Sequence, residues 1–152
     1  MVSKTKALAI ARAASDKKAL DIVTLKMRKV SGVCDYFVIA SGKSTTQTRA
    51  ISDHIKSKLK DSSERLWHSE GEREGSWIVL DYGDVVGHIF LEDTRRFYAL
   101  EKLWHKAERE RFREGPPHIR RKKRRPLKHL EKRAVSGKKR AIGRRRRSPK
   151  KK

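Results

Sequence analysis

The sequence predicts a mixed α/β domain followed by a basic tail that is disordered in isolation. Over residues 1–114, apolar residues recur first at helical and then at strand spacing, in the order αββαβββα. Residues 115–152 are rich in Lys and Arg and poor in apolar residues, so they cannot bury enough surface to offset the cost of ordering. Gly115-Pro116-Pro117 marks the boundary, because Pro cannot continue a helix. We therefore expect a mixed sheet of about five strands with helices packed on it.

The first half of the domain combines one short helix, two strands and one capped helix. The face of the first helix consists of Ala7, Ile10, Ala11 and Ala14. Residues 20–25 are rich in β-formers, and residues 36–40 are continuously apolar, so the second strand should be buried on both faces. The next helix should begin after Ser44, because Ser44-Thr45-Thr46-Gln47 fits a capping box.

The sequence of the second half of the domain predicts a β-hairpin. Residues 66–68 form a weaker strand candidate, and residues 76–82 and 85–90 form strong ones. Gly83-Asp84 between them fits a two-residue type II′ turn, which needs a positive φ at its first residue.

A last helix should follow, capped by Asp93 or Thr94. Its predicted inner side consists of Phe97, Leu100, Leu103, Trp104 and Ala107. Tyr98 points about 100° away from Phe97 on a helix, so one helix cannot easily bury both rings. Some aromatic side chains should therefore be exposed as anchors of a protein interface, unless all of them belong to the core.

The motifs of common enzymes are incomplete. Gly42-Lys43-Ser44 lies between a strand and a helix, where a phosphate-binding loop would lie. The first Gly of that motif is missing, because Phe37 occupies its position. Asp81 and Asp84 lie at opposite ends of a tight turn, so their carboxylates need not converge on a metal. Cys34 has no Cys partner, and no two histidines have helical i, i+4 spacing. We expect no enzyme, no metal and no cofactor.

The charge is concentrated at one end of the chain. The formal net charge is +23, of which residues 1–114 carry +5 and residues 115–152 carry +18. Such a tail predicts a polyanionic partner, although a solubilising polycation is the plainer alternative. The candidate RNA-binding residues of the tail are Arg120, Arg121, Lys122, Lys123, Arg124, Arg125, Arg144, Arg145, Arg146 and Arg147.

Three stretches carry a family resemblance. Residues 76–90, SWIVLDYGDVVGHIF, resemble the signature of the Iojap family, the ribosomal silencing factors. Residues 95–104, RRFYALEKLW, are similar to the final helix of that family, and residues 34–42, CDYFVIASG, match upstream. The resemblance covers about residues 5 to 106.

The resemblance implies a translational repressor. Such proteins bind the large ribosomal subunit through its ribosomal protein fourteen, block association with the small subunit, and lower translation when nutrients are scarce. It also implies a nucleotidyltransferase-like fold without active-site carboxylates, homodimers when free, and, since no long presequence precedes the first helix, a bacterial cytoplasm. rRNA is then the natural partner of the tail.

The resemblance also implies the residues of a protein-binding face or its support. They are Trp77, Leu80, Asp81, Tyr82, His88, Tyr98 and Trp104. Trp77 and Tyr98 would be the anchors. Two alternatives stay open: a ribosome-assembly or general RNA-binding factor, and, more weakly, a nucleotidyltransferase-like enzyme.

Overall fold

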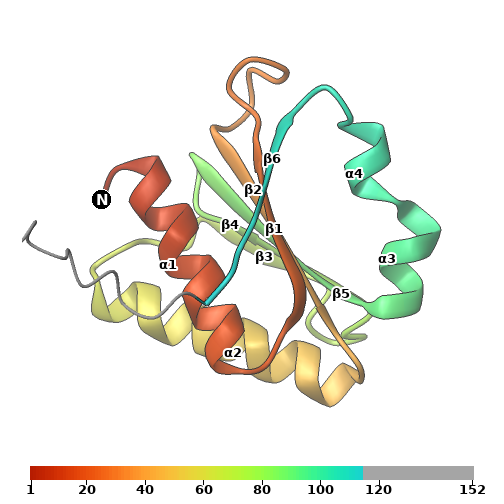
Figure 1. The fold of residues 1–152 in the computed structure, drawn as a ribbon. Helices are drawn as coiled ribbons and strands as arrows, with labels where there is room; N and C mark the ends of the chain where they lie inside the picture. Colours follow the sequence, from red (N-terminus) through yellow and green to blue (C-terminus); the bar gives the residue numbers. More distant parts are fainter. Residues whose placement is uncertain (115–152) are drawn as a thin grey trace, which may run out of the picture. The chain divides into compact units, whose positions relative to one another are not determined.

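The computed structural model describes residues 1–114 as one six-stranded mixed sheet with helices on both faces (Figure 1). The predicted basic tail, residues 115–152, lies outside the described residues. The elements are α1 (Ser3–Asp16), β1 (Leu20–Lys26), β2 (Tyr36–Gly42), α2 (Thr45–Asp61), β3 (His68–Glu70), β4 (Trp77–Asp81), β5 (Val85–Leu91), α3 (Glu92–Tyr98), α4 (Leu100–Leu103) and β6 (Glu108–Arg111).

The strand order is β3-β4-β5-β2-β1-β6. β2 and β5 are parallel, and every other neighbouring pair is antiparallel. These two strands are the most apolar in sequence and lie at the centre, where both faces are covered. The mixed α/β fold is as predicted.

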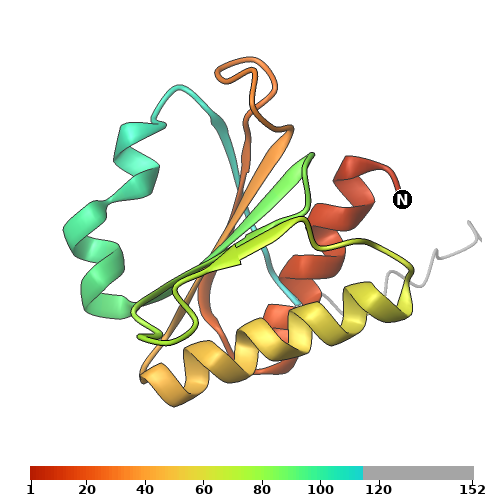
Figure 2. The same cartoon turned by 180° about the vertical axis from the view of Figure 1, so that it is seen from behind.

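The two faces of the sheet carry different cores. α1 and α2 cover one face, and α2 crosses it beneath the strands in the rear view (Figure 2). α3 and α4 lie on the other face, over a smaller core that includes Leu25, Ile39 and Phe90. Among residues 1–114, only the short α3–α4 segment covers that second face, so it is the face with aromatic rings near the surface.

The predicted cap of α2 is confirmed. The Ser44 hydroxyl accepts a hydrogen bond from the backbone N–H of Gln47 at 3.1 Å. The Gln47 Oε1 accepts from the backbone N–H of Lys43 at 2.8 Å, one residue earlier than a capping box requires. Its Nε2 donates to the carbonyls of Lys17 and Lys18, so one side chain joins the start of α2 to the end of α1.

The prediction of one continuous last helix is wrong. Ala99 adopts a left-handed conformation, with φ 45°, and divides the segment into α3 and α4. Phe97 is therefore 81% exposed and Leu103 69% exposed, instead of lining an inner side. Leu100 and Ala107 are buried as predicted. Neither Asp93 nor Thr94 caps α3, which begins at Glu92 without a side-chain cap.

β6 was not predicted from the sequence, and β3 begins later than the strand predicted at residues 66–68. β6 consists of four charged residues and pairs with β1 at the edge of the sheet, with Arg109 opposite Leu25. An all-charged strand has no apolar alternation to reveal it, and such charge protects an exposed edge from pairing with other chains. β3 begins at His68, and Trp67 before it is largely exposed. Gly83 has φ 86°, as the predicted hairpin turn requires.

Within residues 1–114, no helix combines the length and the apolar character needed to cross a membrane.

Candidate functional site

The structure divides the predicted site residues between the two faces of the sheet. Trp77, His88 and Trp104 lie with the core under α3 and α4. Leu80 and Tyr82 lie on the opposite face, fully buried beneath α1 and α2. Alternate residues of a strand point to opposite faces, so Leu80 cannot share a surface with Trp77. Leu80 and Tyr82 therefore support the fold and are not accessible to a partner.

Asp81 belongs to the hairpin turn. Its Oδ1 accepts a hydrogen bond from the backbone N–H of Gly83 at 2.7 Å. Asp84, at the far end of the turn, accepts from the ammonium of Lys6 at 2.6 Å. The two carboxylates are thus engaged separately, and within residues 1–114 no three His, Cys, Asp or Glu side chains gather as a metal site would need.

An aromatic cluster lies where β4 and β5 meet α3 and α4. We define it as Phe37, Trp77, His88, Phe90, Phe97, Tyr98 and Trp104. The Trp77 ring stacks on Phe90 at 4.9 Å between centroids and lies 4.8 Å from Tyr98. Phe97 meets Tyr98 edge to face at 5.1 Å. Rings in these arrangements stabilise one another beyond their burial alone.

The buried His88 side chain orients the Trp77 ring through a hydrogen bond. The Trp77 indole Nε1 donates to His88 Nδ1 at 3.2 Å, so the ring hydrogen of a neutral His88 belongs on Nε2. Burial lowers the pKa of His88 to about 4, which keeps the imidazole neutral near pH 7. Its Nε2 is buried and has no hydrogen-bond partner among the described residues. The imidazole is therefore an internal support for the cluster.

The outer edge of the cluster is exposed. Tyr98 is 53% exposed, beside Phe97, while Trp77 is half-buried. A shallow depression borders these three rings, and Glu74 and Asp93 also line it. Exposed rings on a packed support suit protein docking, because they bury large apolar area with few rotatable bonds.

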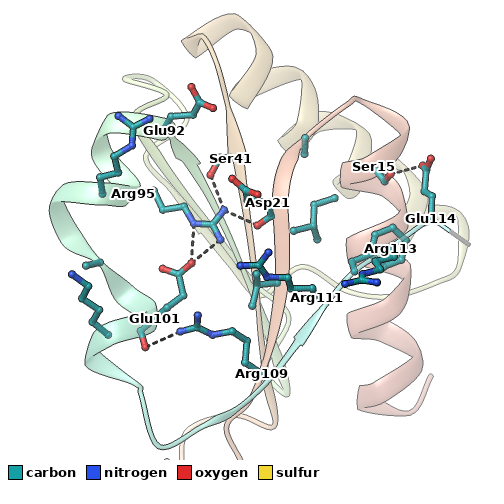
Figure 3. A pocket seen from close by; sticks show the side chains of 17 residues that line it. Ser15, Asp21, Ser41, Glu92, Arg95, Glu101, Arg109, Arg111, Arg113 and Glu114 are labelled. Atoms are coloured by element: carbon teal, nitrogen blue, oxygen red, sulfur yellow. Dashed lines mark hydrogen bonds and ion pairs between the residues drawn. The ribbon is translucent and has the colours of Figure 1, made fainter.

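Arg95 holds α3 and α4 against the sheet (Figure 3). Its guanidinium donates to the backbone carbonyl of Asp21 and to the Ser41 hydroxyl, both at 2.7 Å. It also donates twice to one carboxylate oxygen of Glu101, at 3.0 and 2.6 Å. Burial alone would raise the pKa of Glu101, but the Arg95 hydrogen bonds bring it below its ordinary value. This pairing joins α3 to α4 across the bend at Ala99, next to the exposed Phe97 and Tyr98.

The surroundings of Cys34 disfavour the thiolate that a nucleophile would need. Cys34 is 6% exposed, and burial, assisted by nearby carboxylates, raises the pKa of its thiol to about 11. A thiol in that state is almost wholly protonated near pH 7, as expected for a small apolar core residue.

Comparison with known proteins decides the family. A family model described as "Ribosomal silencing factor during starvation" matches residues 2–142. The chain belongs to the ribosomal silencing factor family. The predicted resemblance is confirmed, and the match extends past residue 106, where the resemblance was expected to end, into the basic segment.

Relatives of the silencing factor family match the domain. A ribosomal silencing factor of Bacillus subtilis is 44% identical over 94 residues, which are 62% of this chain and 80% of the relative. A mouse protein named "Mitochondrial assembly of ribosomal large subunit protein 1" is 35% identical over 91 residues, covering 58% of this chain and 40% of the mouse protein. A crystal structure of a Chromobacterium violaceum protein aligns with TM-score 0.68 at 31% identity, covering 69% of this chain and 88% of that one.

Sequence reasoning missed part of the aromatic surface. Phe97 and Leu103 were expected on the inner side of a continuous helix, and Phe37 was read only as part of a buried strand. One signal was available, because Phe97 and Tyr98 could not both be buried by one helix.

Proposed function

We propose that this chain represses translation by binding the large ribosomal subunit through its ribosomal protein fourteen. The bound domain hinders association with the small subunit and lowers translation under nutrient limitation. Membership of the ribosomal silencing factor family is the observation that carries the proposal. The bacterial relatives support a bacterial cytoplasm as its location.

The exposed edge of the aromatic cluster is the proposed contact surface. Trp77 and Tyr98 are its anchors, and Phe97 extends it. His88 and Trp104 support these rings from within, while Leu80 and Tyr82 stabilise the sheet behind them. In the free protein the same rings can be covered by a second copy, so a homodimer would compete with ribosome binding.

The proposed action is binding, not catalysis. It needs neither a metal nor a cofactor, and it depends on the bulk of the domain and on the affinity of one surface. We further propose that the basic tail, which includes Arg120 and Arg144, adds affinity for rRNA through its phosphates.

Tyr98→Ala should reduce cosedimentation with purified large subunits at least tenfold, because interface anchors of this kind contribute ~2 kcal/mol or more. Trp77→Ala should do the same. Trp67→Ala is the matched control, since Trp67 is 70% exposed but contacts Gly83 instead of the cluster. Circular dichroism of each variant would check folding. Cosedimentation of Tyr98→Ala and Phe97→Ala at the level of the unchanged chain would contradict the proposed surface.

A role in large-subunit assembly is the second candidate. The printed name of the mouse relative supports it. Sucrose-gradient profiles of cells lacking the protein separate the two functions. Repression predicts mature large subunits that join small subunits too readily under starvation, whereas assembly predicts incomplete large subunits during growth. Undiminished binding to naked RNA by Tyr98→Ala, together with unchanged ribosome binding, would instead favour a general RNA-binding factor.

A further inference from the structure

A second concave site lies between α3–α4 and the β1–β6 edge of the sheet (Figure 3). Its cavity has a volume of about 850 Å³. The basic side chains that line it are Arg95, Arg96, Lys102, Arg109, Arg111 and Arg113, and the acidic ones are Asp21, Glu92, Glu101 and Glu114. The aromatic cluster contributes no ring to this lining, so the two sites are distinct.

The register of β6 explains why its arginines face this cavity. Arg109 lies opposite Leu25, and Arg111 opposite Val23, whose side chains both belong to the core under α3 and α4. Paired residues of neighbouring strands point to the same face, so both arginines lie on the α3–α4 side.

The acidic side chains of β6 lie on the opposite face of the sheet from its arginines. Glu108 and Glu110 both pair with the ammonium of Lys26 at 2.8 Å. The edge strand thus separates its charges, with paired carboxylates on one face and arginines on the other. Arg113 continues the alternation, because the backbone N–H of Phe112 still donates to the carbonyl of Ile22 on β1.

The charged groups of the cavity differ in how they are engaged within residues 1–114. Glu101 is held by Arg95, and the Glu114 carboxylate is hydrogen-bonded to the Ser15 hydroxyl, whereas Asp21 and Glu92 form no ion pair there. Among the described residues, Arg109 donates only a long hydrogen bond of 3.4 Å, to the backbone carbonyl of Glu101. Arg111 and Arg113 are exposed and form no ion pair within residues 1–114. Guanidinium groups are therefore available to a ligand from solvent.

We propose that Arg109, Arg111 and Arg113 bind successive phosphate groups of an RNA strand along this edge. Alternate residues of a strand are about 6.8 Å apart, so the row presents evenly spaced guanidinium forks to an extended polyanion. The row leads in sequence into residues 115–152, where 19 side chains are basic and one is acidic. A long polyanion can contact both basic segments, whereas a small anion cannot.

The site binds the phosphate backbone of the RNA and does not read its bases. Phe112 is the aromatic residue that lines the cavity, and it packs toward the core on the α1 side. Without a stacking platform, affinity depends on phosphate charge and is strongly sensitive to salt. RNA binding here does not rest on the proposed function, because it uses other residues and can be measured without ribosomes.

Binding of a fluorescein-labelled 20-nucleotide oligouridylate to the full chain, followed by anisotropy from low to moderate salt, tests the site. In Arg109→Gln/Arg111→Gln, the slope of log affinity against log salt should fall by about 1.4, since each single-strand phosphate contact contributes about 0.7. The control is Lys58→Gln/Lys60→Gln, which removes the same charge from exposed positions near the end of α2, on the other face of the sheet. Its slope should stay unchanged. Thermal melts confirm that both variants fold.

Equal slopes for the arginine pair and the lysine pair would overturn the site, because they would mean diffuse attraction alone. A polyglutamate of equal length is the second probe. If the arginine pair weakens polyglutamate binding as much as oligouridylate binding, the site takes acidic peptides and the RNA assignment is wrong. Tyr98→Ala should leave oligouridylate binding unchanged, so failure of this site and failure of the ribosome-binding surface can be told apart.

Discussion

At the scale of single residues, His88 couples the aromatic cluster to pH. Its pKa is lowered by burial to about 4, against an ordinary value of 6.5. The unfolded chain therefore binds a proton at higher pH than the folded chain does. Protonation of the unfolded chain thus lowers the free energy of unfolding as the pH falls from 6.5 towards 4. The total decrease is about 3 kcal/mol, and above pH 6.5 this loss is absent.

The prediction is a decrease in the free energy of unfolding between pH 6.5 and 4.5, measured by urea titration. His88→Phe cannot bind a proton and should flatten the curve over that interval, before most carboxylates titrate. His105→Phe is the matched control, because it makes the same replacement at an exposed position outside the aromatic cluster. The same slope in His88→Phe as in the unchanged chain would show that His88 is not the titrating group.

At the scale of elements, the bent α3–α4 segment depends on the ion pair between Arg95 and Glu101. Their side chains are 11% and 17% exposed, so removing one partner leaves a shielded charge. Arg95→Ala should lower the free energy of unfolding by about 2 kcal/mol and weaken the near-ultraviolet signal of Trp77, which contacts Tyr98 on α3.

Arg96→Ala provides the comparison. Arg96 pairs with Asp93, but these side chains are 74% and 93% exposed, so solvent screens their attraction and stability should hardly change. If Arg95→Ala proved as mild as Arg96→Ala, the bend at Ala99 would have to be held by packing alone.

At the scale of the whole molecule, most of the net positive charge follows, in sequence, the domain that carries the aromatic cluster. Residues 1–114 carry a net charge of +5, and the rest carries +18. A chain truncated after Glu114 should still bind large subunits through the aromatic cluster, but more weakly at low salt and with a flatter salt dependence. Cosedimentation at several salt concentrations measures both effects. An unchanged salt slope would show that the tail does not contact rRNA.

The features that depend on neighbours along the chain could be predicted from the sequence. The apolar run of residues 36–40 became a central strand, Ser44 and Gln47 formed their cap, and Gly83 took the positive φ of its turn. The family signature at residues 76–90 also needed no structure, because it is a pattern of residue types. Each of these follows from local preference or from spacing.

Long-range contacts were needed to define the bend at Ala99, the strand β6 and the accessible part of the candidate site. Ala99 takes a left-handed conformation, while Arg95, one turn earlier, bonds to Ser41 and to the Asp21 carbonyl, 54 and 74 residues away. β6 is a strand because β1 offers it a free edge, not because its charged residues favour one. These contacts join segments distant in sequence, so their energy cannot be read from local patterns, and they decide that Phe97 and Tyr98 meet solvent while Leu80 and Tyr82 do not.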